Sequence, residues 1–294
     1  MAGLLYQIGY LAVILFIVTS MLVMGLNVTI RDLLSPLHNK KLIILSLLAN
    51  FVVVPLFAFA LIYIFPISAG LAAGLILVAI AAGAPSTPKV AEFTGGNIAY
   101  AVALTLLMTI LTIVLMPFLV PYLMEGVGMN PAKVAFNLVM FMLVPILAGI
   151  LLRDKLPGVS KRVLPIAEIV SNVSIGVIFL TFGIIFLTHL QVLFGGPGGL
   201  EVAFVAIVFT IGALLIGYFM GGPDQRGTLA FGTGFRNVTA ALVVITASYS
   251  DLTNDIFLMV LMVTIFSVII VSVIVGIIMK KRMDAEKRSK GTGS

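Results

Sequence analysis

Long apolar segments separated by short polar loops run through the whole of this 294-residue sequence. A helix needs about 20 apolar residues to cross a bilayer, and nine segments come close to or exceed that length. Only 10% of the residues are charged, whereas a soluble domain carries about 25%. The sequence therefore predicts an all-α polytopic membrane protein, residues 1–294 forming a single unit of nine transmembrane helices. The approximate ranges of the helices are 5–29, 42–65, 69–94, 98–124, 133–152, 162–190, 200–220, 226–249 and 254–280.

The basic residues gather in alternate loops between these segments. If the C-terminus is cytoplasmic, the opposite side holds Lys133 as its one basic loop residue. Cytoplasmic loops are enriched in Lys and Arg, so we expect an outside N-terminus, a cytoplasmic tail at 283–294 and a location in a prokaryotic inner membrane. The basic surplus therefore reflects membrane topology and indicates no nucleic-acid partner. The cytoplasmic basic residues are Arg31, Lys40, Lys41, Arg153, Lys155, Lys161, Arg162, Arg226 and those from Lys280 to Lys290.

Two of the predicted spans contain runs that interrupt a helix. Residues 83–88 (GAPSTP) lie in the third span, and residues 232–234 (GTG) lie in the eighth. Proline lacks a backbone N–H and glycine tolerates unusual backbone angles. Freed backbone groups at that depth are tolerated only where protein or a water-filled cavity covers them. Broken spans in both halves of a chain are typical of secondary transporters, so we expect breaks near 85–89 and 232–237 that cross one another.

The two halves of the chain follow a similar plan. In each half, a broken span is followed by a long unbroken one. The first broken span is expected to start outside and the second to start inside, which predicts an inverted repeat. Residues 1–126 then hold four spans and residues 131–282 hold five, so the N-terminal repeat lacks one helix.

Three charged residues, Lys89, Glu92 and Arg236, lie inside predicted spans. A charge near the middle of a bilayer costs at least about 2.5–3.5 kcal/mol, so such residues are rare and usually functional. Lys89 and Glu92 are three positions apart and can pair on one helical face. They form either an internal salt bridge or part of a site, unless Glu92 reaches the cytoplasmic interface. Arg236 has no acidic neighbour in its own span, so we expect Glu92 or an anionic substrate beside it.

Polar residues around the breaks supply the candidate sites. Unpaired carbonyls and hydroxyls suit a cation, whereas the N-terminal ends of half-helices favour an anion. No cysteine, nucleotide-binding loop or hydrolase motif is present, so we expect neither an enzyme nor a cofactor. The candidate substrate-binding residues are Arg236, Asn237, Lys89, Thr233, Asn27 and Asn172. The candidate ion-binding or coupling residues, with Na+ as the ion, are Glu92, Ser86, Thr87, Thr109 and Thr112.

Several motifs, taken in order, resemble the bile acid:sodium symporter family over nearly the whole chain. The motifs are residues 24–27 (MGLN), 31–33 (RDL), 50–55 (NFVVVP), 95–97 (GGN) and 234–237 (GFRN). The resemblance implies ten spans, or nine where the first is missing, arranged as a core domain with two crossed broken helices and a panel domain beside it. It also implies organic-anion substrates and two sodium ions that drive uptake.

The sequence departs from this family pattern at the ion sites. The family's usual acidic residue in the second crossing helix aligns with Gly232, and its usual glutamine aligns with Arg236. Two cations, Lys89 and Arg236, therefore lie where the resemblance implies sodium, and like charges repel. We expect these two side chains to stand in for one or both sodium ions.

The sequence thus predicts a secondary active transporter of a small organic anion that works by alternating access. Sodium symport follows from the family resemblance, whereas the two cations favour sodium-independent transport. A cation/proton antiporter that uses Glu92 and Lys89 as its titrating pair is the first alternative. A membrane receptor that does not transport is the second.

Overall fold

A computed structural model describes residues 2–28, 40–123, 130–188, 199–247 and 253–291, and the regular structure in these ranges is entirely helical. Two π-helical turns, η2 and η3, lie inside otherwise continuous helices. The elements in chain order are α1 (Ala2–Leu26), α3 (Lys40–Leu48), η2 (Ala49–Val53), α4 (Val54–Ile64), α5 (Ala69–Ile80), α6 (Thr87–Thr94), α7 (Ile98–Leu123), α8 (Pro131–Leu138), η3 (Val139–Leu143), α9 (Val144–Lys155), α10 (Pro157–Thr188), α12 (Gly199–Met220), α13 (Gly222–Gly234), α14 (Val238–Ala247) and α15 (Thr253–Gly291).

Eight helical segments in the described part of the chain are long and apolar enough to cross a membrane, judged by length and composition. The prediction was nine spans. The remaining one, 69–94, is divided between α5 with 12 residues and α6 with 8, so neither piece reaches bilayer length alone. The other predicted broken span, 226–249, is divided between α13 and α14. Helix α15 continues to Gly291, well past its predicted end at 280.

The two π-helical turns each precede a proline. The backbone N–H of Val54 donates to the carbonyl of Ala49, five residues back, and Val144 does the same to Val139. Pro55 and Pro145 follow directly and have no N–H to donate. A wider turn takes up the missing hydrogen bond without ending the helix. In the first turn this places Asn50 in the protein interior.

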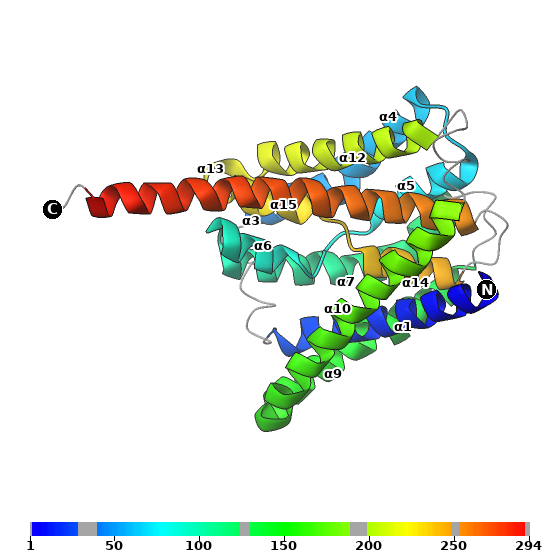
Figure 1. Cartoon of the computed structure of the whole chain (residues 1–294), viewed down its shortest axis with the longest axis horizontal. Coiled ribbons are helices and arrows are strands. Elements are labelled where there is room, and N and C mark those ends of the chain that lie inside the picture. The colour runs from blue at the N-terminus through cyan, green and yellow to red at the C-terminus, as the bar shows by residue number, and fades with distance from the viewer. Residues whose placement is uncertain (1, 29–39, 124–129, 189–198, 248–252, 292–294) are drawn as a thin grey trace.

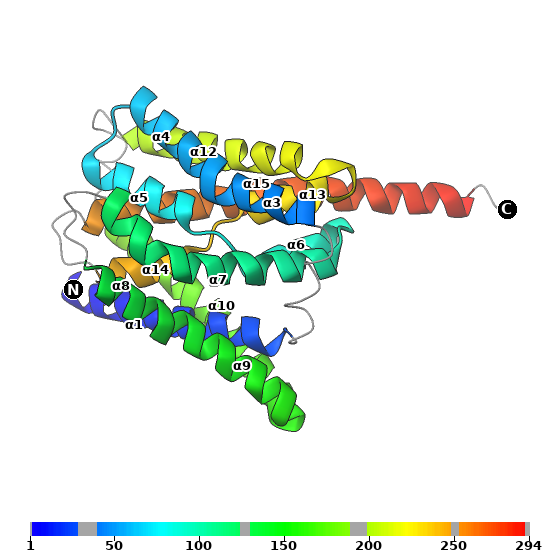
Figure 2. The ribbon, with the colours of Figure 1, turned by 180° about the vertical axis from the view of Figure 1, so that it is seen from behind.

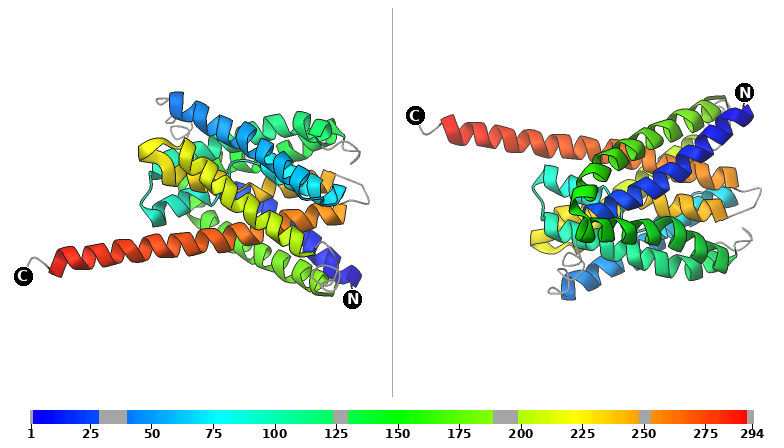
Figure 3. Two further views of the ribbon diagram at one scale, coloured as in Figure 1. Left: turned by 90° about the horizontal axis from the view of Figure 1, so that it is seen from above. Right: turned by 90° about the horizontal axis from the view of Figure 1, so that it is seen from below.

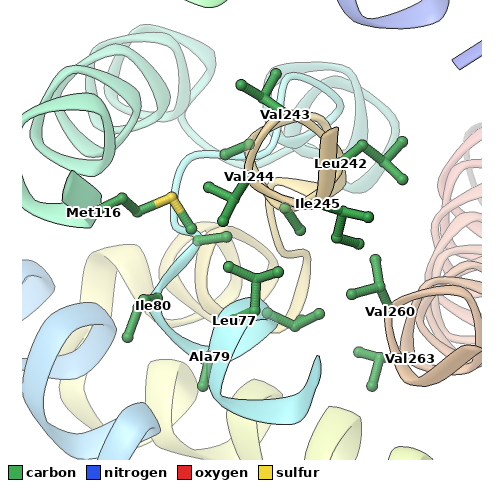
Figure 4. Close-up of a cluster of buried hydrophobic side chains, with 14 of the residues drawn as sticks. Leu77, Ala79, Ile80, Met116, Leu242, Val243, Val244, Ile245, Val260 and Val263 are labelled. Carbon is green, nitrogen blue, oxygen red and sulfur yellow. The ribbon is translucent and has the colours of Figure 1, made fainter. Parts of the chain in front are cut away.

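The helices pack in two groups. Helix α1 lies chiefly against α10 and α9, and these three helices occupy one side of the molecule (Figures 1 and 3). On the other side, α12 packs on α13, and α15 packs on α5 and α12. The half-helices α5 and α14 meet α7 and α15 in the main apolar cluster (Figure 4). This cluster supports the ends of both half-helices at the breaks.

Glycines allow α1 and α9 to approach closely. A Cβ atom added to Gly149 meets the backbone oxygen of Leu22 at 2.6 Å and the backbone nitrogen of Leu26 at 2.7 Å. A Cβ atom added to Gly25 on α1 would lie even closer to main-chain atoms, 2.1 Å from the backbone oxygen of Ile146. Small residues at such crossings let transmembrane helices pack through their backbones. Arg153 of α9 adds a hydrogen bond of 3.3 Å to the carbonyl of Leu26.

Replacing Gly149 by alanine should destabilise this helix pair. The added methyl group meets main-chain atoms that cannot rotate away, so we expect a loss of about 1–3 kcal/mol, measured as a lower thermal unfolding midpoint in detergent. Gly176 of α10 has no atom within 4 Å of its added Cβ, so Gly176→Ala is the matched control and should leave the midpoint unchanged or slightly raised. Equal effects of the two substitutions would contradict the close packing of α1 on α9.

Candidate functional site

The two broken spans contact each other at their interruptions. The backbone N–H of Asn237, between α13 and α14, donates to the carbonyl of Ala81, between α5 and α6, at 2.8 Å. The side-chain amide of Asn237 donates to the carbonyl of Gly83 at 3.0 Å. The two spans run in opposite directions, and the segment that joins α5 to α6 passes the α13–α14 junction (Figures 1 and 2). We call this meeting point the crossing.

The first break follows from its sequence. Helix α5 ends because Ala81 has φ −84° and ψ 85°, outside the helical region. Gly83 has φ +86°, and a Cβ atom there would lie 2.5 Å from both the backbone nitrogen and Oγ1 of Thr109. Only glycine combines this backbone angle with such a close approach. A turn at Pro85 and Ser86, closed by the N–H of Thr87 donating to the carbonyl of Ala84 at 3.1 Å, then leads into α6. Helix α6 begins at Thr87 and has Pro88 in its first turn, where the missing N–H has no intrahelical partner to lose.

Threonines of α7 satisfy the backbone that the first break exposes. Oγ1 of Thr112 accepts from the N–H of Ala82 at 3.1 Å and donates to its carbonyl at 3.0 Å. Oγ1 of Thr109 lies 2.9 Å from the carbonyl oxygen of Gly83. Both threonines are fully buried. These two candidate ion-binding residues therefore lie at the crossing, where they bond to backbone groups.

Arg236 caps the end of α5. Its side chain is 6% exposed, and Nε donates to the carbonyl of Val78 at 3.0 Å. Nη2 donates to the carbonyl of Ala79 and, at 3.5 Å, to that of Asn50. Nη1 donates to Oδ1 of Asn50 at 2.8 Å and to the carbonyl of Thr233 at 3.2 Å. A guanidinium has five N–H groups, and here they have five oxygen partners.

The oxygens around Arg236 are all neutral. Four are backbone carbonyls and one is an amide oxygen. The carbonyls of Val78 and Ala79 lie in the last turn of α5, where the helix dipole places partial negative charge. Arg236 is the one charged side chain that is buried among the residues the structure describes. The alternative in which Glu92 pairs with Arg236 is therefore wrong.

Lys89 and Glu92 lie on the outer face of α6. Their side chains are 63% and 52% exposed, and Nζ of Lys89 is 2.8 Å from Oε2 of Glu92. The expectation that these two charges are buried is wrong, because α6 buries Thr87, Val90 and Ala91 and turns its charged face outward. The two side chains do form an ion pair, but it is exposed and so is not the internal salt bridge that was one of the two alternatives. Lys89 does not join Arg236 at the crossing.

The remaining candidate residues also fall into a buried group and an exposed group. Asn237 and Thr233 are fully buried at the crossing, and Oδ1 of Asn237 accepts from the N–H of Ala240 to cap α14 at 3.1 Å. Thr87 is buried beside Gly232, whose added Cβ would lie 3.5 Å from Thr87 Cγ2. The candidates on exposed positions are Ser86, Asn27 and Asn172.

Asn50 is a residue of the crossing that sequence reasoning did not select. Besides its two contacts with Arg236, its Nδ2 donates to the carbonyl of Ser46 at 3.0 Å and to Oγ1 of Thr233 at 3.3 Å. It is completely buried. An asparagine inside an apolar span, five residues before a proline, was the available signal. Asn50 therefore links the second span directly to the second break and, through Arg236, to the end of α5.

The crossing contains two buried threonine hydroxyls whose hydrogen-bonding capacity is unused. Oγ1 of Thr87 and Oγ1 of Thr105 are buried and have no hydrogen-bond partner among the described residues. A buried polar group without a partner costs roughly 1–3 kcal/mol, so such groups are usually bonded to something. Among the described residues of the crossing, these two hydroxyls therefore remain without a hydrogen bond.

Comparison with known proteins gives a consistent result. Residues 12–195 match the Sodium Bile acid symporter family. The P3 protein of Homo sapiens is 25% identical over 244 residues, which cover 79% of this chain and 50% of that protein.

Two plant proteins also match. The protein named "Probable sodium/metabolite cotransporter BASS2, chloroplastic" of Oryza sativa subsp. japonica is 28% identical over 151 residues, covering 51% of this chain and 36% of that protein. The corresponding BASS6 protein of Arabidopsis thaliana is 23% identical over 246 residues, with 79% and 59% covered. The chain thus spans about half the length of the curated relatives it matches.

Substitution of Thr112 and substitution of Thr105, both on α7, should have very different effects on the free energy of unfolding. Thr112→Val keeps the side-chain shape but strands the N–H and carbonyl of Ala82, so we expect a loss of about 1–3 kcal/mol in unfolding free energy. Thr105→Val is the matched control, because it removes a hydroxyl that has no partner, and it should be neutral or stabilising. Thermal unfolding of both variants in detergent without added ligand measures the difference. A loss on Thr105→Val as large as that on Thr112→Val would contradict the hydrogen-bond assignment.

Proposed function

Because this chain belongs to the Sodium Bile acid symporter family, we propose that it is a secondary transporter of a small organic anion that works by alternating access. The family is one of transporters and not of enzymes. The observation that carries the proposal is the buried guanidinium of Arg236 at the crossing, held by neutral oxygens alone. A membrane protein that buries an uncompensated positive charge between two broken helices has a strong electrostatic preference for an anion there.

Arg236 acts on the anion through its charge. All five of its N–H groups already have oxygen partners in the protein, so a direct bidentate contact with the substrate would break existing hydrogen bonds. The hydroxyls of Thr87 and Thr105 are available as donors instead. Asn237 and Thr233 complete the proposed substrate site, while Lys89 stays outside it, paired with Glu92 on the outer face of α6.

Sodium is not required in this proposal. Peptide carbonyls at an unwound helix are the groups that hold a coupling ion in transporters with broken helices. At the crossing, the guanidinium of Arg236 occupies the oxygens of Val78, Ala79 and Asn50. It supplies the positive charge that a bound cation would otherwise supply to the end of α5. Arg236 is therefore proposed as a tethered replacement for a sodium ion.

The proposed movement separates the two groups of helices. Helices α1, α9 and α10 pack mainly on one another, which supports their assignment as a panel domain, with the broken spans in a core domain. The opposite directions of α5–α6 and α13–α14 in Figure 1 support an inverted repeat. The basic residues of α9, α13 and α15 lie toward the end of the molecule that carries the C-terminus, which supports a cytoplasmic C-terminus.

Arg236→Gln should create a dependence on sodium that the parent protein lacks. The substitution removes the positive charge from the five oxygens that surround Arg236, so the variant should be less stable in choline chloride. Sodium chloride should restore part of this stability, because Na+ binds the folded state at these oxygens. A Na+ concentration 100 times its dissociation constant contributes about 2.7 kcal/mol. The measurement is the thermal unfolding midpoint in NaCl against choline chloride at equal ionic strength.

Arg153→Gln is the matched control for this experiment. Arg153 also donates to a helix-end carbonyl, that of Leu26 on α1, but it lies away from the crossing. Its variant should show the same midpoint in both salts. A parent protein that sodium stabilises more than choline would contradict the tethered-cation proposal, even if Arg236→Gln does not fold.

Organic anions should stabilise the protein equally in sodium and in choline. A thermal-shift screen of carboxylates and sulfonates, with organic cations of similar size as controls, should find stabilising ligands among the anions only. If no anion raises the midpoint and a sodium gradient instead drives proton flux in liposomes, the antiporter alternative based on Glu92 and Lys89 replaces this proposal.

A further inference from the structure

The positive charge at the crossing belongs to the chain, and this determines which charges cross the membrane in a transport cycle. We infer that the protein carries an organic monoanion without a coupling ion, so that each cycle moves one net negative charge and a membrane that is negative inside drives the anion outward. The inference rests on the proposed function and adds to it the driving force and the direction of transport.

Only species that bind on one side and leave on the other contribute to the net charge moved. A sodium ion held at a broken helix is released at the end of the half-cycle, so its gradient performs work. The guanidinium of Arg236 is covalently attached and returns with the protein to its starting position. Its charge attracts the anion, yet it carries nothing across the membrane over a complete cycle.

The first break keeps no cluster of unbonded carbonyls for a mobile cation. The carbonyls of Val78 and Ala79 accept from Arg236, and the four that follow Ile80 accept from other groups of the chain. The carbonyl of Ala81 accepts from the N–H of Asn237, that of Ala82 from Thr112 Oγ1, and that of Ala84 from the N–H of Thr87. The carbonyl of Gly83 accepts from both Thr109 Oγ1 and the side-chain amide of Asn237. Sodium would have to break several of these hydrogen bonds before it could bind there.

A coupled proton also lacks a carrier at the crossing. Proton coupling requires a buried group that gains and loses its charge, and Arg236 is the one buried charged side chain in the described ranges. A guanidinium stays protonated in proteins. Glu92 is more than half exposed and is paired with Lys89. The unpartnered hydroxyls of Thr87 and Thr105 are neutral, so they bring no negative charge that would offset the repulsion between Arg236 and a cation at the crossing.

Membrane voltage is then the driving force that remains. For one charge, a tenfold change in an equilibrium ratio corresponds to about 59 mV. A potential of about 100 mV, negative inside, therefore holds a roughly 50-fold outward gradient of a monoanion. Uptake against this potential would need a coupled cation, and the charge of Arg236 repels a cation at the crossing. The structure thus favours export.

The test is the steady distribution of permanently charged monoanions across liposomes that contain the full-length protein. The probes are radiolabelled isethionate, benzenesulfonate and taurocholate, because sulfonates stay ionised and neither cross lipid nor carry protons. A tenfold K+ gradient with valinomycin sets the potential, in choline buffer or with sodium added. Protein-free liposomes measure leakage.

We expect at least one probe to be transported, with its inside concentration about tenfold below the outside concentration when the interior is negative and about tenfold above it when the interior is positive. Sodium should change neither ratio. A ratio that follows the sodium gradient, or one that ignores the potential, would overturn the inference while leaving transport in place. If none of the three probes is transported and no anion stabilises the protein in the thermal-shift screen, the proposed function itself is overturned.

Discussion

The hydrogen bonds between Arg236 and the end of α5 are the interaction on which the arrangement of this protein depends. A helix that ends inside a bilayer exposes carbonyl groups that water cannot reach, and each unsatisfied group destabilises the fold. Here the donors come from the other broken span and from α7, so each break is satisfied by a segment that is distant in sequence. This mutual satisfaction explains why α13–α14 is enclosed by other helices although it crosses the molecule.

Arginines lie at two further helix ends in the same structure. Arg153 donates to the carbonyl of Leu26 at the end of α1, and the guanidinium of Arg282 packs against Gly95, which ends α6 in the left-handed conformation. A cation near the C-terminal end of a helix interacts favourably with its dipole. What distinguishes Arg236 is burial, because in a low-dielectric interior its charge is felt more strongly by any ligand nearby.

The positions of the breaks could be predicted from sequence, because Gly and Pro act locally. Arg236 lies two residues after Gly234, so its place at the crossing could be predicted together with the break. Its partners could not be predicted, since backbone carbonyls leave no mark in a sequence, and Asn50 is 186 positions away. The exposure of Lys89 was missed because an average over 69–94 merges a 12-residue apolar helix with an 8-residue amphipathic one.

The central claim, that a tethered guanidinium takes the place of a mobile cation, is tested most directly by locating monovalent cations in the protein. A crystal structure from crystals soaked in Tl+, whose anomalous scattering identifies cation positions, measures this. The account predicts no Tl+ peak within bonding distance of the carbonyls of Val78 and Ala79, with the Arg236 side chain occupying that place. A Tl+ peak on these carbonyls, with Arg236 turned away from them, would contradict it.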